Sequence, residues 1–134
     1  MANEDQMQDS KAVKIAISHV HAWSCHDWNK TKELLPLNVH AFVTSTQPAF
    51  GSGEFTRADN YMERKKQAAQ LVEPGSVRLI STIGDKSNAL ILMTFRIGLG
   101  PGGTMVTMAR SSRYLLDQNG KIKDERDQFV VLSQ

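Results

Sequence analysis

Two acidic side chains near the end of the chain, Glu125 and Asp127, could transfer protons. They are two residues apart in a strand-like stretch, so both point to one side of the strand, about 7 Å apart. Two carboxylates this close and partly shielded from water repel each other, which raises one pKa. The pair could then supply an acid and a base near neutral pH. The stretch from Lys121 to Asp127 could equally be a solvated terminal strand whose charges only face water.

More polar side chains join this pair if the last two strands form a hairpin. The dipeptide Asn119-Gly120, flanked by apolar residues, favours a two-residue turn that sets Ser112 opposite Asp127. A type I turn followed by a bulge at Gly120 is the alternative, and it would set Ser112 opposite Arg126. The face is too polar for an ordinary core, so it faces water or lines a polar pocket. Its other members are Arg110, Tyr114, Glu125 and Phe129.

Arg96 lies in an earlier strand-like stretch that is apolar on both faces, which predicts that the strand is buried. A buried arginine needs an acidic partner or an anionic ligand, and Asp127 or Glu125 would serve. Thr94 shares the face of Arg96 and is a candidate contact for the same ligand. The alternative is that Arg96 lies at the strand end and extends its charged head into water.

Three residues of the predicted helices complete the candidate site. His19 lies beside Trp23 at the edge of a buried helix face, where it could donate a hydrogen bond to an oxyanion. A satisfied core histidine is the alternative. Trp23 and Tyr61 are candidates for the pocket wall or the core. The four histidines show no paired ligand spacing, so no metal site is predicted.

Length and composition limit the possible classes of protein. A chain of 134 residues suits one domain, which we place at residues 10–134 after a disordered tail at 1–9. The net charge of +2 comes from 16 basic and 14 acidic residues that are mixed along the chain, which argues against a nucleic-acid groove. The basic run Arg64-Lys65-Lys66 is interpreted as the solvated face of a helix.

The same composition predicts a soluble, cytoplasmic protein. No apolar run is long enough for a membrane helix, and the acidic N-terminus is unlike a signal peptide. The single cysteine, Cys25, cannot form an internal disulfide, and we expect it to be buried.

The predicted elements follow the order helix, helix, strand, helix, then four strands joined by hairpins. This order predicts an α+β fold with three helices on one face of a strongly curved antiparallel sheet. The run from Gly98 to Gly103 precedes a strand, so it is a hairpin connection and not a phosphate loop. The first expected helix runs from Lys11 to about Cys25 after an N-cap at Ser10, and the second is a short helix capped by Asn29 or Thr31 and ended by Pro36. A strand from Val39 to Thr46 and a loop from Gln47 to Gly53 lead to a third helix from Thr56 to about Val72. The remaining strands are expected at Val77 to Ile83, Ala89 to Ile97 and within Thr104 to Val131.

This order, with His26-Asp27 closing the first helix and Gly120-Lys121-Ile122 opening the last strand, resembles the nuclear transport factor 2-like superfamily. The resemblance covers nearly the whole chain. The superfamily includes ketosteroid isomerases, SnoaL-type polyketide cyclases, limonene epoxide hydrolases, scytalone dehydratase and non-catalytic binding domains. The resemblance implies a cone-shaped, cystatin-like α+β barrel with a ligand pocket between the concave sheet and the helices, and often a dimer.

Matched by position, the resemblance separates these activities. His19 falls where ketosteroid isomerases have a catalytic tyrosine, and Ser112 falls where they have a protonated aspartate, so their chemistry is not expected. Arg126-Asp127 resembles the Arg-Asp pair of limonene epoxide hydrolases, which implies a catalytic role for Asp127. The second acid of that family is absent, because Arg96 stands about where it would be.

Two functions are consistent with these residues. In the first, the protein is a cofactor-independent isomerase, cyclase or hydrolase of a small lipophilic molecule. Asp127 would be the base, Glu125 its partner, and His19 and Arg96 the donors to a developing oxyanion. In the second, it is a non-catalytic ligand-binding or protein-interaction domain, and the polar face is an internal salt-bridge network.

The expected partners are a small lipophilic molecule and a second copy of the chain, with no nucleic acid and no membrane. A sheet covered by helices on one face only leaves its other face open. Met105, Met108 and Val131 would then help to expose an apolar surface, so we predict a homodimer.

Overall fold

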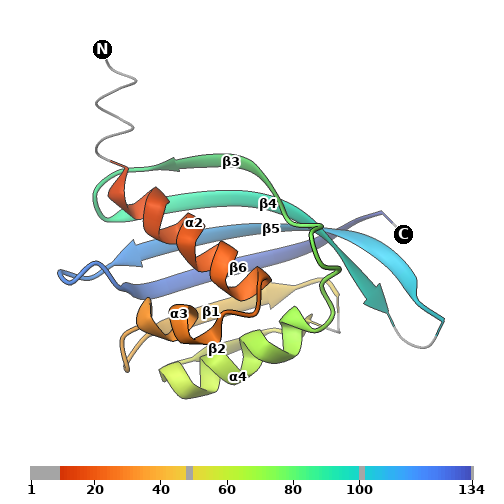
Figure 1. Ribbon diagram of the computed structural model, residues 1–134, viewed down its shortest axis with the longest axis horizontal. Coiled ribbons are helices and arrows are strands. Elements are labelled where there is room, and N and C mark those ends of the chain that lie inside the picture. The colour runs from red at the N-terminus through yellow and green to blue at the C-terminus, as the bar shows by residue number, and fades with distance from the viewer. Residues whose placement is uncertain (1–9, 48–49, 100–101, 134) are drawn as a thin grey trace, which may run out of the picture.

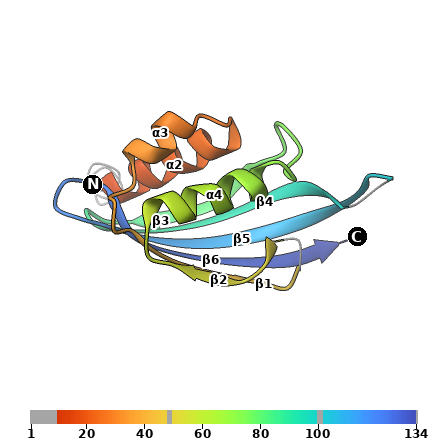
Figure 2. The same ribbon diagram turned by 90° about the horizontal axis from the view of Figure 1, so that it is seen from below.

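Six strands form one curved sheet in the order β2-β1-β6-β5-β4-β3, and three helices lie on one of its faces (Figures 1 and 2). The computed structural model describes residues 10–47, 50–99 and 102–133. The predicted tail at 1–9 and positions 100–101 of the glycine-rich connection lie outside the described residues. The predicted α+β class is confirmed. No helix within the described ranges is both long and apolar enough to cross a membrane.

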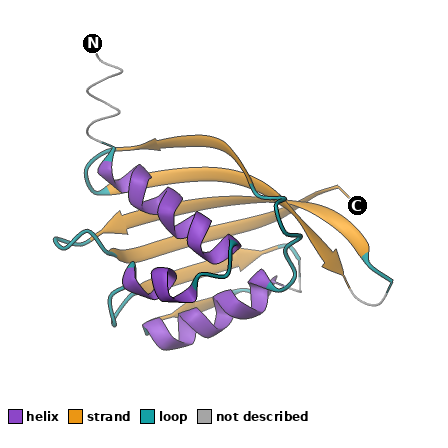
Figure 3. Cartoon of the chain, viewed as in Figure 1, coloured by secondary structure: helices purple, strands orange, loops and turns teal. Residues whose placement is uncertain are grey.

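The order of elements agrees with the prediction except for one added strand (Figure 3). That strand, β2, covers Gly53–Phe55, where we predicted a loop and the approach to a helix. Three residues are too few to show an alternating pattern. In chain order the elements are α2 (Lys11–Ser24), α3 (Trp28–Glu33), β1 (His40–Ser45), β2 (Gly53–Phe55), α4 (Ala58–Ala69), β3 (Arg78–Gly84), β4 (Asn88–Leu99), β5 (Thr104–Leu116) and β6 (Ile122–Ser133).

The sheet is mixed and not wholly antiparallel. Strand β1 runs parallel to β6, with Val43 opposite Asp127, whereas the remaining neighbours pair antiparallel. Sequence periodicity identifies strands but not which strands pair, so this neighbour of β6 was not predicted. The pairing places β1 beside the strand that carries both candidate acids.

Helix α2 packs its apolar stripe against the sheet. Ala12, Ala16, His19 and Trp23 recur at spacings of four, three and four, and all four are buried as predicted. The helix ends before Cys25, which is exposed, so its predicted burial is wrong. Cys25 follows the last turn of the helix, beyond the stripe that faces the sheet.

The cap of helix α3 is Asp27, not Asn29 or Thr31. The Asp27 carboxylate accepts a hydrogen bond from the Lys30 backbone N–H at 3.1 Å. His26 precedes it with a φ of 59°, the left-handed conformation that reverses the chain between the two helices.

Strand β4 is buried on one face only. Its inward side chains, Met93 and Phe95 among them, are buried, whereas Leu90 and Leu92 on the other face are 50% and 39% exposed. The prediction that this strand is buried on both faces is therefore wrong. All three helices lie on the inner face, and no described element covers the outer one (Figure 2).

Of the three apolar residues that we named, only Met105 lies on the outer face of the sheet. Met108 is fully buried on the inner face, and its partner Val131 lies on the same side. Met105 is partly buried. The exposed apolar side chains on the outer face of the sheet include Phe42, Ile83, Leu90, Leu92, Val130 and Leu132.

The turn between β5 and β6 is not the two-residue turn that we favoured. The Gly120 N–H donates to the Asp117 carbonyl at 3.1 Å, which makes Gln118 and Asn119 the central residues. Gly120 has a φ of 77°, whereas Asn119 lacks the positive φ of a two-residue type I′ turn. The geometry is that of a type I turn followed by a glycine bulge.

The pairing of β5 with β6 at the polar face is nevertheless the one that we predicted from a two-residue turn. Leu116 pairs with Ile122, but Leu115 pairs with Asp124, so Lys123 is an extra residue on β6. This second bulge shifts the ladder by one residue and compensates for the turn. Ser112 therefore lies opposite Asp127, as predicted.

Candidate acid–base site

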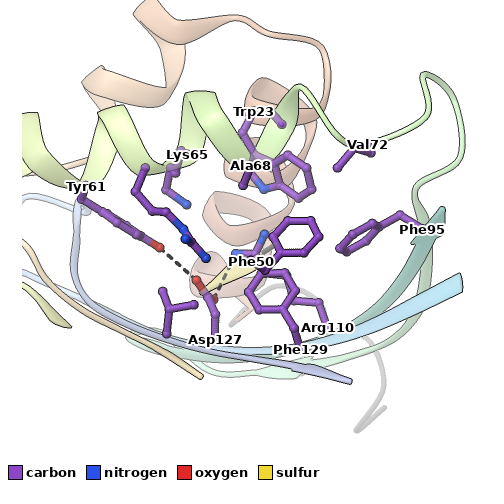
Figure 4. Close-up of a pocket in the computed structure, with 13 residues that line it drawn as sticks. Trp23, Phe50, Tyr61, Lys65, Ala68, Val72, Phe95, Arg110, Asp127 and Phe129 are labelled. Atoms are coloured by element: carbon purple, nitrogen blue, oxygen red, sulfur yellow. Dashed lines mark hydrogen bonds and ion pairs between the residues drawn. The ribbon is translucent and has the colours of Figure 1, made fainter. Parts of the chain in front are cut away.

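The centre of the site is the carboxylate of Asp127, which is 3% exposed. Its Oδ1 accepts hydrogen bonds from Arg110 at 3.0 Å and from the Ser112 hydroxyl at 2.6 Å. Its Oδ2 accepts one from the Tyr61 hydroxyl at 2.9 Å, and Figure 4 shows Tyr61 reaching from α4 to the sheet. Three donors from two elements, β5 and α4, therefore fix the orientation of this carboxylate.

Glu125 lies beside Asp127 on the same face of β6, as the alternation of the strand predicts. Its Oε2 accepts hydrogen bonds from Arg110 at 2.8 Å and from Lys65 Nζ at 3.3 Å. Its Oε1 lies 3.7 Å from His19 Nε2. The two carboxylates thus share one guanidinium, and neither is a solvated surface charge.

Arg110 connects the polar residues with the aromatic ones. Besides both acids, its guanidinium donates to the Ser112 hydroxyl at 2.6 Å and to the Tyr114 hydroxyl at 3.2 Å. Its Cζ lies 5.1 Å from the centre of the Trp23 ring and 5.6 Å from that of Phe129. A buried cation needs paired charge, and contacts with aromatic faces stabilise it further.

Burial and charge drive the pKa values of the two acids apart. Burial raises the pKa of Asp127, and the neighbouring Glu125 raises it further against the opposing effect of Arg110. Burial would also raise the pKa of Glu125, but Lys65 and Arg110 together bring that pKa below its ordinary value. A pair with split pKa values contains one group suited to exchange protons and one that stays ionised.

His19 is held behind Glu125 and does not line the cavity described below. Burial lowers its pKa, and the positive charges of Lys65 and Arg110 lower it further, so the ring is neutral. It packs edge-on against Tyr114, with ring centres 5.6 Å apart. Neither ring nitrogen has a hydrogen-bond partner among the described residues. The structure therefore brings His19 to Glu125 but not to the position expected for an oxyanion donor.

A small cavity of about 40 Å³ opens beside Asp127, between α4, α2 and the inner face of the sheet. This volume is on the order of one or a few water molecules. One part of its wall is apolar and largely aromatic, and the other part is polar (Figure 4). The apolar side chains include Trp23, Val43, Phe50, Phe95 and Phe129, and the polar ones are Tyr61, Arg64, Lys65, Arg110 and Asp127.

Helix α4 supplies polar residues that sequence reasoning placed elsewhere. Lys65, expected on a solvated face, is 8% exposed, and its ammonium lies 4.3 Å from the centre of the Tyr61 ring. Arg64 is half-buried, and only Lys66 of the basic run is exposed. The signal that could have found Lys65 is its spacing of four residues from both Tyr61 and Ala69, which places it on the buried stripe.

Arg96 and Thr94 are not part of this site. Both lie on the outer face of β4, where Arg96 is 52% exposed and its Nη1 lies 3.5 Å from Glu73 Oε2. The predicted pairing of Arg96 with Asp127 is therefore wrong, because the two side chains lie on opposite faces of the sheet. Arg110, named only as a substrate contact, occupies the role that we assigned to Arg96.

Of the other predicted contacts, Trp23, Tyr61, Arg110 and Phe129 line the cavity. Ser112 and Tyr114 are fully buried behind Arg110, which they orient by hydrogen bonds. No group of three histidine, cysteine, aspartate or glutamate side chains in the described part of the chain is arranged to hold a metal ion.

Comparisons of sequence and of structure give different results for this chain. No sequence profile of a known protein family matches it, and no curated protein matches it. Solved structures do match. A nuclear transport factor 2-like protein from Burkholderia xenovorans is 10% identical with a TM-score of 0.72, and the match covers 90% of each chain.

Two further structures have names that refer to an enzyme, one by activity and one by fold. An LEH-like epoxide hydrolase from M. tuberculosis is 16% identical with a TM-score of 0.67, over 91% of this chain and 84% of that one. A protein with a ketosteroid isomerase-like fold from Catenulispora acidiphila, in complex with trimethylamine, is 13% identical with a TM-score of 0.67, over 84% and 82%. Identities this low show the fold alone: the chain has the nuclear transport factor 2-like fold.

Proposed function

We propose that the protein is a cofactor-independent enzyme that acts on a small, largely apolar molecule by acid–base catalysis at Asp127. The observation that carries this proposal is the position of Asp127. Among the described residues it is the only carboxylate that lines the cavity, and burial raises its pKa. A raised pKa brings a carboxylate closer to the range in which a general base works at neutral pH.

The other polar residues would keep Asp127 ready for proton transfer. Tyr61, Ser112 and Arg110 hold the carboxylate in one orientation, so it need not reorganise when a substrate arrives. Glu125, whose pKa is lowered, stays ionised and balances the charges of Lys65 and Arg110. The cationic groups on the cavity wall would stabilise negative charge that develops on the substrate when Asp127 removes a proton.

The fold is consistent with isomerase, cyclase or hydrolase chemistry, and the name of the M. tuberculosis structure supports the last of these. The site differs from the epoxide hydrolase pattern, because its two acids, Glu125 and Asp127, lie on one face of β6 and share Arg110 of β5. We therefore propose the general class of acid–base reactions on ketones, epoxides or related small molecules.

Turnover after substitution of Asp127 tests this function. Compounds that raise the melting temperature in a screen of lipophilic ketones, epoxides and polyketide-like acids are assayed for conversion. Asp127→Asn should abolish conversion of a substrate while ligand affinity stays largely intact, and the wild-type rate should depend on pH. Asp59→Asn, an exposed acid on α4, is the matched control and should retain full activity.

Non-catalytic ligand binding is the second candidate, and one observation favours it. Both acids are already paired inside the protein, and the cavity is small, as in a network that only stabilises the fold. Ligands would then bind without being converted, and Asp127→Asn would change stability alone.

A further inference from the structure

The cavity beside Asp127 is closed to a substrate of the proposed class. Its volume is about 40 Å³, whereas pockets that hold small organic molecules enclose about 300 Å³ or more. The Phe50, Phe95 and Phe129 side chains fill the space beside it by packing on one another. On the proposed function, a part of the wall therefore has to move before a substrate reaches Asp127.

Helix α4 is held in place by buried interactions. It is tied to β6 by the Tyr61–Asp127 hydrogen bond at 2.9 Å and by the Lys65–Glu125 ion pair at 3.3 Å. All four of these side chains are buried. Because breaking a buried ion pair leaves an uncompensated charge, α4 is not the part of the wall that moves most easily.

Phe50 belongs to a part of the wall with fewer attachments. It lies in the segment between β1 and β2, whereas the other aromatic side chains of the wall belong to α2, α4 and interior strands of the sheet. Strand β2 is the edge of the sheet and pairs with β1 along three residues only. Short edge strands open readily, because few backbone hydrogen bonds hold them.

The side-chain contacts of residues 50–55 lie near the surface. Arg64 Nη2 donates to the Gly51 carbonyl at 2.8 Å, and the Arg64 side chain is half-buried. His40 Nε2 and the Glu54 carboxylate are 2.6 Å apart, and both side chains are exposed. Water can replace contacts of this kind, so residues 50–55 can leave the fold more easily than α4 can.

From the closed cavity and these near-surface contacts we infer that residues 50–55 form a strap that opens as one piece to admit the substrate. When the strap moves away, the Phe50 ring leaves its stack on Phe129, and the space that it filled joins the cavity beside Asp127 (Figure 4). An apolar group of the substrate then replaces the Phe50 ring, which offsets the loss of its buried area. This inference rests on the proposed function, because it concerns the route to Asp127.

Labelling of a buried thiol by iodoacetamide measures whether Phe50 leaves the cavity. Phe50→Cys and Phe95→Cys are made in a Cys25→Ser background, because Cys25 is exposed and would react. Phe50 and Phe95 are both 1% exposed and in ring contact, so they differ mainly in the element that carries them.

The two variants should react by different routes. Phe50→Cys should react at least about tenfold faster than its own global unfolding equilibrium allows, with little dependence on urea. Phe95→Cys should react only as fast as its global unfolding equilibrium allows, with the full dependence on urea. Labelling of both variants through global unfolding alone would overturn the inference.

Arg64→Met tests the contact that holds the strap. It removes the hydrogen bond to the Gly51 carbonyl, so Phe50→Cys should react about fivefold faster or more, whereas Phe95→Cys should still follow its global unfolding equilibrium. Lys66→Met, on the solvent side of the same helix, should leave the reaction of Phe50→Cys as it is. An unchanged rate for Phe50→Cys after Arg64→Met contradicts the strap.

Hydrogen exchange on the wild-type protein needs no substitution. The amides of residues 50–55 should exchange through an opening that leaves the amides of β5 and β6 protected. Exchange of both sets in one global step would overturn the inference, even where a cysteine variant does not fold.

Turnover distinguishes the strap from the proposed function. If residues 50–55 open locally but Asp127→Asn leaves turnover intact, the proposed function fails and the strap stands. If Asp127→Asn abolishes turnover but residues 50–55 open only with the whole protein, the strap fails and the proposed function stands.

Discussion

Ser112 and Asp127 lie directly opposite each other on β5 and β6, and the Ser112 hydroxyl donates to Asp127 at 2.6 Å. The pairing depends on two irregularities that cancel. The turn at Gln118 and Asn119 shifts the ladder by one residue, and the extra residue Lys123 shifts it back. Since a slip of one residue turns every side chain to the other face, the bulge keeps the acids inside.

The bulge gives a prediction about deletions. Without Lys123 the strand continues from Ile122 to Asp124 with regular alternation, so Glu125 and Asp127 still face inward. We expect this deletion to cost less than about 1 kcal/mol in the free energy of unfolding. Deletion of Arg126 should turn Asp127 to the outer face and cost more than about 3 kcal/mol, because Arg110 loses a buried partner.

Urea unfolding measures both deletions. Lys123 and Arg126 are both exposed on β6, so loss of buried surface does not distinguish them. Equal costs for the two deletions would show that the register is not fixed by the bulge.

The shared guanidinium of Arg110 predicts strong coupling between Arg110 and Asp127. Arg110→Met leaves two buried carboxylates with only Lys65 as a cationic partner, and it should cost about 3 kcal/mol or more. Asp127→Asn in the same chain removes one of those charges. The double variant should therefore be more stable than the sum of the single changes predicts, by about 1 to 3 kcal/mol.

Arg96→Met is the control for this cycle. Arg96 is half-exposed and its ion pair with Glu73 is long, so its loss should cost less than about 0.5 kcal/mol and add to Asp127→Asn without coupling. Additive effects of Arg110→Met and Asp127→Asn in urea unfolding would contradict the shared buried network.

The local patterns of this sequence predict the helices, most strands and the polar face of the last hairpin. Each depends on neighbours in the chain, such as the stripe from Ala12 to Trp23 or the alternation of Glu125 and Asp127. The parallel pairing of β1 with β6 joins distant segments, so no local pattern contains it.

The errors at the candidate site have one physical cause, which is that burial depends on which face is covered. Arg96 was placed in the pocket because its strand is apolar on both faces, but its outer face has no helix over it. Lys65 was placed in water because two basic neighbours surround it, but its position on the helix points it at Glu125. A run of charged residues does not show which of its side chains faces the core, whereas the spacing of Tyr61, Lys65 and Ala69 places all three on the buried face of α4.

His40 predicts a stability term that depends on pH. Its ring lies between Glu54, at 2.6 Å, and Asp124, at 3.3 Å, and joins β2, β1 and β6 at the sheet edge. The hydrogen bond to Glu54 has the largest effect and raises the pKa of His40, whereas burial lowers it. The hydrogen bond to Asp124 raises it further, so the pKa of His40 lies above 6.5. Because this pKa is higher in the folded than in the unfolded protein, charged His40 adds to the free energy of unfolding. The contribution is complete below pH about 6.5 and is lost as the pH rises through the pKa of His40 in the folded protein.

His40→Gln should therefore destabilise the protein more near pH 6 than near pH 9, as measured by urea unfolding at both. A pH-independent effect of His40→Gln would show that the ring is not charged in the fold.

The open outer face of the sheet predicts a homodimer. Ile83, Leu90 and Leu92 are exposed on the neighbouring strands β3 and β4 there, and no described element covers them. Contiguous apolar surface of this kind marks an interface, and burying one leucine contributes about 1.5 to 3 kcal/mol. A symmetric dimer contains the substituted residue on both sides of its interface, so Leu92→Asp should yield monomers of 14.9 kDa in sedimentation at micromolar concentration.

Leu37→Asp is the matched control, because Leu37 is 85% exposed in the segment between α3 and β1 and lies off the sheet. It should leave the dimer intact, and a wild-type protein that sediments as a monomer would refute the prediction.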